Sequence, residues 1–148
     1  MLRDIKNKSK LKIYFKMNSS IDSHQEKLII AKKAAKKAGK FLLKNKNILN
    51  KTLFSNDKDI KLQADISSEK LIIDIISSES DIPILAEESG ISSNNIPKTF
   101  WVVDPLDGTA NYSRGIPCCC VSIALISNLK PVLGVVYDFN NNDLYEGS

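Results

Sequence analysis

Apolar residues recur every three or four positions in the first third of the chain. The recurring positions are Leu28, Ala31, Ala35, Ala38 and Leu42. This spacing is typical of an amphipathic helix with one buried face. The tetrapeptide SHQE forms a capping box, in which the side chains of Ser23 and Glu26 accept hydrogen bonds from each other's backbone N–H groups. We therefore predict a helix that begins at Ser23.

A second helix is predicted to begin at Asp65, in the stretch ADISSEKLIIDIISSES. Four apolar side chains share one face of this helix: Leu71, Ile72, Ile75 and Ile76. Three serines mark its end, Ser77, Ser78 and Ser80, because serine competes with the helix for backbone hydrogen bonds.

The later part of the chain carries apolar runs that are typical of strands. IPILAEESG predicts a short strand followed by two glutamates, and TFWVVD predicts a strand that ends in an aspartate. CCCVSIALI and PVLGVVYDF predict two further strands, joined through SNLK as a hairpin. Because the helices come first and the strands later, the fold class is predicted to be α/β (α+β), with layered helices and sheet.

Charge divides the chain into two unlike parts. Residues 1–51 contain 15 Lys and Arg and 3 Asp and Glu, whereas residues 52–148 contain 6 Lys and Arg and 14 Asp and Glu. The net charge of +4 is therefore the sum of a strongly basic first part and an acidic second part. Residues 1–22 are basic without a sustained period and are predicted to be a disordered extension, and residues 23–148 form the α/β portion. The lysines of the first helix are expected to form a solvated face: Lys33, Lys36, Lys37, Lys40 and Lys44.

Several classes of protein are excluded by composition. No apolar run approaches the roughly 20 residues of a membrane-spanning helix, and the start lacks the features of a secretory signal, so a cytoplasmic protein is expected. The three cysteines are consecutive, Cys118 to Cys120, which suits neither a disulfide framework nor a zinc site. We expect them to be reduced, small and buried.

Carboxylates follow two of the predicted strands. Glu87 and Glu88 follow one apolar run, and Asp104 ends the next, which suggests a shared rim at one edge of a sheet. Unpaired negative charges that meet beside a low-dielectric interior repel one another, and a divalent cation removes that repulsion. Oxygen ligands without nearby His or Cys favour a hard ion such as Mg²⁺.

The segment DPLDGT adds a second kind of chemistry. Pro105 restricts the chain, so that Asp104, Asp107 and the Leu106 carbonyl can be aimed at one point. Gly108 permits close backbone approach, and Thr109 can open a helix whose first N–H groups attract an anion. Taken singly, these residues also suit plain turns and caps. Together they predict a site that cleaves or transfers a phosphate.

At these residues the chain resembles the inositol monophosphatase family of lithium-sensitive, magnesium-dependent phosphatases. The resemblance rests on WVVDPLDGTANYSRGIPCCCVSIALI, LAEES and ADISSEKLI, and extends from about Glu26 to Glu146. It implies a layered αβαβα sandwich of the inositol monophosphatase and fructose-bisphosphatase kind. The chain is expected to hold its N-terminal half, with a further metal ligand and most contacts to the leaving group in the other half.

The resemblance also implies residue roles. The metal ligands would be Glu87, Asp104, the Leu106 carbonyl and Asp107. Glu88 would support these ligands without binding the metal itself. Asp65 and Thr109 would be the catalytic pair that orients a metal-bound water, and the phosphate would rest on Gly108, Thr109 and Ala110. Four positions depart from the family pattern: Lys61, Leu62, Ala110 and Tyr112.

The implied activity is Mg²⁺-dependent hydrolysis of a small phosphomonoester, such as an inositol monophosphate. A 3′(2′),5′-bisphosphate nucleotide, a sugar bisphosphate and histidinol phosphate stay open as substrates. A haloacid-dehalogenase-type phosphatase fits less well, because its motif has one residue between the aspartates and this chain has two.

The rival class is an inactive binding or assembly module. The lysines lack the interleaved aromatic residues of a stacking surface, which weighs against a nucleic-acid partner. The composition gives no reason to expect a membrane partner, and the resemblance leaves a homodimer open.

Overall fold

The computed structural model describes residues 24–55, 60–91 and 96–148. The predicted cap at Ser23 and the predicted extension over residues 1–22 lie outside these residues. The first helix occupies residues 24–44, and its apolar stripe is buried as predicted, with Ala31, Ala35, Ala38 and Leu42 all at 0% exposure. Its five named lysines are exposed, which confirms the solvated face. None of the described helices is long and apolar enough to cross a bilayer.

The second helix, α3, spans Gln63–Glu79 and so begins two residues before the predicted position. Asp65 lies in its first turn, where its carboxylate accepts the backbone N–H of Leu62 at 2.6 Å. Leu62 has no side-chain acceptor for the helix start, so the carboxylate of Asp65 closes this end instead.

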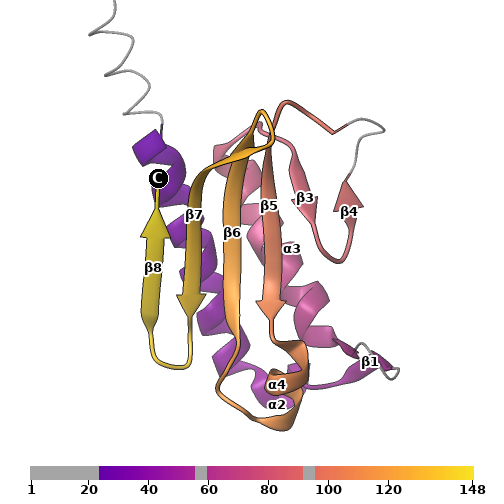
Figure 1. Ribbon diagram of the computed structural model, residues 1–148. Coiled ribbons are helices and arrows are strands. Elements are labelled where there is room, and N and C mark those ends of the chain that lie inside the picture. Colours follow the sequence, from indigo (N-terminus) through magenta and orange to yellow (C-terminus); the bar gives the residue numbers. More distant parts are fainter. Residues whose placement is uncertain (1–23, 56–59, 92–95) are drawn as a thin grey trace, which may run out of the picture.

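A six-stranded sheet forms the centre of the molecule, in the order β4-β3-β5-β6-β7-β8 (Figure 1). Its strands are β3 (Ile84–Ala86), β4 (Gly90–Ile91), β5 (Thr99–Asp107), β6 (Cys120–Ser127), β7 (Lys130–Asp138) and β8 (Asp143–Gly147). The pairing of β3 with β5 is parallel, and the other neighbours are antiparallel. The predicted hairpin between β6 and β7 is confirmed, with Asn128 and Leu129 both at positive φ.

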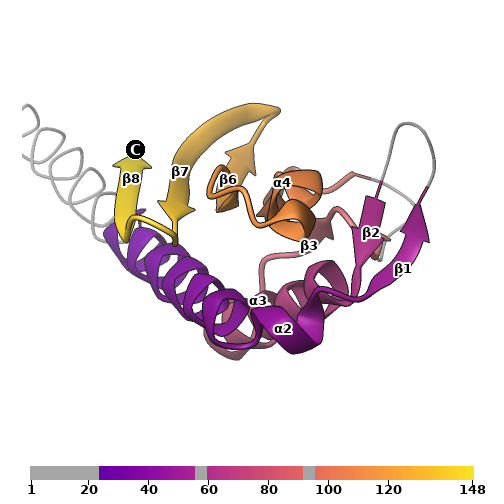
Figure 2. The same ribbon diagram turned by 90° about the horizontal axis from the view of Figure 1, so that it is seen from below.

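Both long helices pack on the same face of this sheet (Figure 2). Alternate residues of the strands point toward the helices and are buried, while those between them are more accessible, as the alternating burial along β6 shows. The buried strand residues include Trp101, Val103, Val121, Ile123, Leu125, Leu133, Val135 and Tyr137. The core therefore lies between one helical layer and one face of the sheet.

The end of one strand and the burial of the cysteines differ from the sequence-based predictions. The strand predicted to end at Asp104 continues as β5 to Asp107, with a register shift over Pro105, which has no N–H to donate to the ladder. Cys119 is buried as predicted, but Cys118 is exposed and Cys120 only partly buried, because the chain reaches the sheet only at Cys120. The burial prediction was therefore wrong for Cys118.

Several short elements were not predicted, among them β4. The others include the helix α2 (Lys46–Leu49) and the hairpin of β1 (Thr52–Ser55) with β2 (Ile60–Leu62). All four residues of β1 are exposed, so no alternation of buried and exposed positions marks it in the sequence.

The contact at Gly39 tests the packing of the first helix on the sheet. A Cβ atom at Gly39 would lie 2.6 Å from Phe139 Cβ and 2.7 Å from the Tyr137 ring. Gly39→Val is therefore expected to lower the free energy of unfolding by about 2 kcal/mol through overpacking, as measured by urea denaturation. Lys40→Ala, at the exposed neighbouring position, should change it by less than about 0.5 kcal/mol. Equal stability of the two variants would contradict this packing.

Candidate functional site

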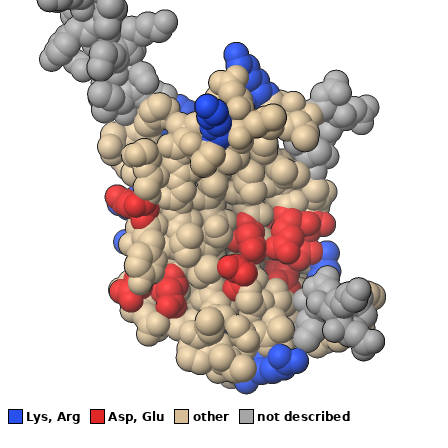
Figure 3. All heavy atoms as spheres, viewed as in Figure 1, with Lys and Arg blue, Asp and Glu red and all other residues tan. Residues whose placement is uncertain are grey.

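The parallel pairing of β3 with β5 brings two strand ends together. Ala86 lies opposite Val103, and the backbone N–H of Glu87 donates to the Val103 carbonyl at 3.1 Å. Glu87 therefore leaves β3 beside Asp104. The shared acidic rim expected from the sequence is present, and acidic side chains gather on this side of the molecule (Figure 3).

The carboxyl groups of Glu87 and Asp104 are close enough for each to shift the pKa of the other. Partial burial, followed by the hydrogen bond and the charge of Asp104, raises the pKa of Glu87 to about 7. Burial also raises the pKa of Asp104, although the hydrogen bond with Glu87 and the Leu106 N–H, 3.2 Å away, oppose that shift. Two carboxylates this close repel each other when both are ionised.

Asp65 and Thr109 meet directly, although 44 residues separate them. The Thr109 hydroxyl donates to Asp65 Oδ1 at 2.8 Å and also lies 3.0 Å from the Leu106 carbonyl oxygen. The other carboxylate oxygen of Asp65 accepts the Leu62 N–H, so both oxygens of this 2%-exposed group have partners. Burial raises the pKa of Asp65, and these hydrogen bonds oppose the rise.

The turn after β5 leads directly into the short helix α4 (Thr109–Arg114). Gly108 precedes this helix with φ at +89°, a conformation that side chains with a Cβ rarely adopt. A Cβ there would also lie 2.7 Å from the Cys118 carbonyl oxygen. The helix predicted to open at Thr109 is confirmed, and Gly108, Thr109 and Ala110 lie half-buried at its start.

Asp107 is exposed, and its charge raises the pKa of Asp104. Its Oδ2 lies 3.7 Å from the Cys120 thiol, and burial together with the Asp107 charge raises the pKa of Cys120 to about 12. Within the part of the chain that the structure describes, no three His, Cys, Asp or Glu side chains are arranged to hold a metal ion. The proposed ligand roles of Glu87, Asp104, Leu106 and Asp107 therefore stay predictions.

The donor chemistry of these groups nevertheless fits a hard divalent cation. Carboxylates and one carbonyl supply only oxygen atoms, which Mg²⁺ prefers. A cation would also stabilise the ionised form of the Glu87–Asp104 pair, because the charge of each carboxylate raises the free-energy cost of ionising the other.

The supporting roles of two residues were not predicted from the sequence. Glu69, only 4% exposed, accepts the backbone N–H of Glu88 at 2.7 Å and so fixes the turn after β3. Lys61 forms an ion pair with the Glu88 carboxylate, and this hydrogen bond is the largest cause that raises the pKa of Lys61. Glu69 could have been noticed because it lies four residues after Asp65, on the same face of one helix.

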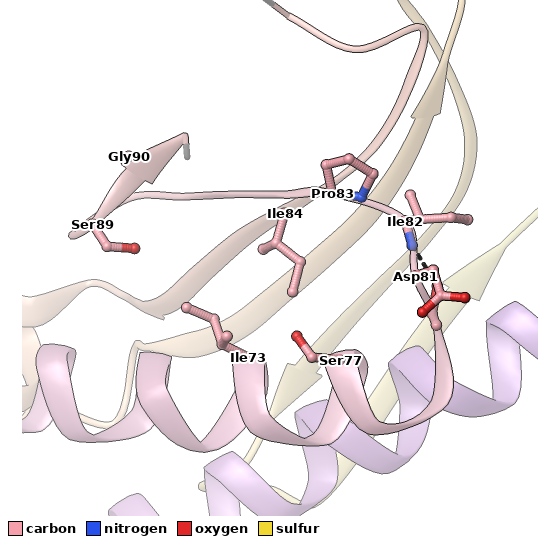
Figure 4. Close-up of a pocket in the computed structure, with 9 residues that line it drawn as sticks. Ile73, Ser77, Asp81, Ile82, Pro83, Ile84, Ser89 and Gly90 are labelled. Atoms are coloured by element: carbon pink, nitrogen blue, oxygen red, sulfur yellow. Dashed lines mark hydrogen bonds between the residues drawn. The ribbon is translucent and has the colours of Figure 1, made fainter. Parts of the chain in front are cut away.

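Two hollows in the surface differ in their relation to this site. One of about 390 Å³ adjoins it and is lined by residues that include Asp107, Gly108, Asn111 and Cys118. A second, of about 420 Å³, lies between the end of α3 and β3 (Figure 4). Among the described residues that line this second hollow, only Asp81 is charged. The second hollow therefore offers no cluster of charged side chains that could bind a metal ion or a phosphate.

Comparison with known proteins gives matches over most of the chain. The sequence model of the inositol monophosphatase family matches residues 23–148. The protein named Nus factor SuhB of Xylella fastidiosa is 42% identical over 120 residues, which are 78% of this chain and 42% of that protein. Inositol monophosphatase 1 of Solanum lycopersicum is 32% identical over 129 residues, 84% of this chain and 47% of that protein.

Solved structures of similar proteins also match most of the chain. The extragenic suppressor protein suhB of Bartonella henselae matches with a TM-score of 0.73 and 34% identity, over 82% of this chain and 48% of that one. The inositol monophosphatase of Anabaena matches with a TM-score of 0.72 and 36% identity, over 85% and 45%. The chain therefore spans about half the length of the relatives it matches.

The contact between Thr109 and Asp65 is open to a direct test. Thr109→Val removes the hydroxyl and leaves a buried carboxylate without one of its donors, so the free energy of unfolding should fall by about 1–3 kcal/mol. Thr109→Ser keeps the hydroxyl and should retain most of the stability. Urea denaturation of both variants measures the difference, and equal losses would show that the hydrogen bond is not the cause.

Proposed function

The chain belongs to the inositol monophosphatase family, and we propose that it supplies the catalytic half of a Mg²⁺-dependent phosphatase acting on a small phosphomonoester. The observation that carries this proposal is the juxtaposition of two pairs. A bound cation would stabilise the ionised Glu87–Asp104 pair. The Asp65–Thr109 pair beside it can accept a proton from a water molecule, because the Thr109 hydroxyl donates to Asp65.

The residues that would hold Mg²⁺ are Glu87, Asp104, the Leu106 carbonyl and Asp107. A divalent cation bound there would lower the pKa of a water molecule and stabilise the leaving oxygen. The Leu106 carbonyl oxygen, one of the proposed ligands, lies 3.0 Å from the Thr109 hydroxyl, which supports a ligand set next to the proposed proton acceptor.

Thr109 and Asp65 provide a route for the proton of the attacking water. A water beside Thr109 can give a proton to Oγ1 while the hydroxyl passes its own proton to Asp65 Oδ1, 2.8 Å away. Because burial raises the pKa of Asp65, that carboxylate is a stronger base than an exposed aspartate. The Leu62 N–H holds the second oxygen and fixes the orientation of the carboxylate.

The phosphate would rest on the backbone at the start of α4. Gly108 brings the main chain close to the site without a side chain, and the first N–H groups of the helix can receive phosphate oxygens. Glu88, held by Lys61 and by the contact of its N–H with Glu69, keeps the adjoining turn in place.

The substrate is proposed to be an inositol monophosphate, with a bisphosphate nucleotide and histidinol phosphate as the alternatives to be compared. In-line attack by water requires no covalent enzyme intermediate. Trapping of an aspartyl-phosphate would instead support the haloacid-dehalogenase-type mechanism.

A second candidate is a binding or assembly role without catalysis. Several relatives carry the name Nus factor SuhB, and the first helix of this chain presents a row of exposed lysines. Such a surface attracts phosphate groups of a nucleic acid without sequence preference.

Asp104→Asn tests the phosphatase proposal in a full-length version, in which the remaining half of the fold follows residue 148. Loss of a charged ligand is expected to reduce Mg²⁺-dependent phosphate release from inositol monophosphate by more than about 100-fold. Glu79→Gln breaks an ion pair with Lys33 on the helical side and should leave turnover unchanged. Normal turnover in Asp104→Asn would refute the assignment.

Replacing Lys36, Lys37 and Lys40 together with Gln separates the two candidates. Under the phosphatase proposal the triple variant keeps phosphate release within about 2-fold, because these side chains lie on a solvated helix face. RNA binding that weakens with salt and is lost in this variant, without phosphate release by the parent protein, would favour the assembly role.

A further inference from the structure

The β1–β2 hairpin brings one lysine to the acidic side of the candidate site. Its second strand ends at Leu62, which is fully buried, and leads directly into α3. Neighbouring side chains on a strand point to opposite faces, so Lys61 points away from the core that Leu62 joins. The Lys61 ammonium forms an ion pair with the carboxylate of Glu88, which lies in the turn after β3.

Glu88 belongs to a set of carboxylates that influence one another. We call Asp65, Glu69, Glu87, Glu88 and Asp104 the acidic group. Burial is the main cause that raises the pKa values of Asp65, Glu87 and Asp104, and the charge of Glu88 adds to the rise in all three. Glu69 is tied to the same turn, because it accepts the backbone N–H of Glu88. The charge of Glu88 therefore acts on the whole group.

Lys61 responds to the same group as a cation. Its pKa is raised by the hydrogen bond with Glu88 and, although burial opposes the rise, by the charges of Glu88, Glu69 and Asp65. The ammonium therefore stays protonated at neutral pH. Its partner Glu88 is not one of the proposed metal ligands, so the ion pair leaves the carboxylate oxygens of Glu87 and Asp104 available to a cation.

A fixed positive charge at this place has two electrostatic effects. Without a divalent cation it offsets part of the repulsion within the acidic group, and so stabilises the fold. When a divalent cation binds to Glu87 and Asp104, the same charge repels it and weakens its binding. A role of Lys61 that consists only of holding the turn predicts the opposite, because loss of Lys61 would then loosen Glu87 and weaken the binding of the cation.

We propose that Lys61 is a counter-charge that lowers the affinity of the candidate site for Mg²⁺ and takes over part of the cation's stabilising role when the site is empty. This inference rests on the proposed metal role of Glu87 and Asp104. Position 61 is one of those at which the chain departs from the family pattern, so the effect is specific to this chain and its near relatives with a lysine there.

The test measures the melting temperature of the 148-residue chain in EDTA and over a series of MgCl₂ concentrations. Lys61→Met keeps an unbranched side chain and removes its charge. In EDTA this variant should melt about 3 °C below the parent chain, because Glu88 loses its partner. As Mg²⁺ binds, this deficit should disappear. The Mg²⁺ concentration that gives half of the stabilisation should be about 3- to 10-fold lower than for the parent.

Two further variants serve as controls. Lys61→Arg retains the positive charge and should match the parent in EDTA and in MgCl₂. Lys33→Met removes one lysine charge and one ion pair, with Glu79, on the helical side of the molecule. Its deficit should be the same at every MgCl₂ concentration. A parallel series in NaCl of equal ionic strength corrects for the screening of surface charges.

The inference is overturned if the deficit of Lys61→Met stays constant as Mg²⁺ is added, or if this variant requires more Mg²⁺ than the parent. Asp104→Asn separates that failure from a failure of the proposed function. If the metal role of Asp104 is correct, this variant loses the part of the Mg²⁺ response that exceeds the response to NaCl. A parent chain without such a response, or a response that Asp104→Asn retains, would refute the proposed metal role and the inference with it.

Discussion

The parallel pairing of β3 with β5 is the constraint on which the candidate site depends. Parallel strands end at the same edge of a sheet, so the residues that follow them emerge side by side. In this chain those residues are acidic, and the N–H of Glu87 still bonds to the ladder at the Val103 carbonyl. The backbone therefore holds Glu87 beside Asp104 against the repulsion of their side chains, and burial, followed by the proximity of Asp104, raises the pKa of Glu87 to about 7.

The buried carboxylates of α3 show how the fold tolerates acidic groups away from water. Asp65 and Glu69 are 2% and 4% exposed, and each accepts at least one backbone N–H. Such bonds offset much of the cost of burying a charge. They also connect elements, because Asp65 joins the start of α3 to the start of α4, and Glu69 joins α3 to the turn after β3. The same contacts thus stabilise the fold and position Thr109 and Glu88.

Much of this arrangement could be predicted from the sequence wherever the signal is local. The stripe from Leu28 to Leu42 has helical spacing, SNLK occupies the connection of a tight hairpin, and two apolar runs end in acidic residues. The missed features depend on neighbours that are distant in the sequence. The β1–β2 hairpin has no alternating pattern, Cys118 is exposed because the sheet begins two residues later, and the partners of Glu69 and Lys61 lie on other elements.

The position of Asp107 extends the acidic group along β5. Its carboxylate lies beside the Cys120 thiol, and its charge also raises the pKa of Asp104. Negative charges therefore gather at one end of β5, where a neighbouring charge disfavours the ionisation of Glu87 and of Asp104. A divalent cation with oxygen ligands would remove that repulsion, and this electrostatic cost is the physical ground for the proposed metal role of these residues.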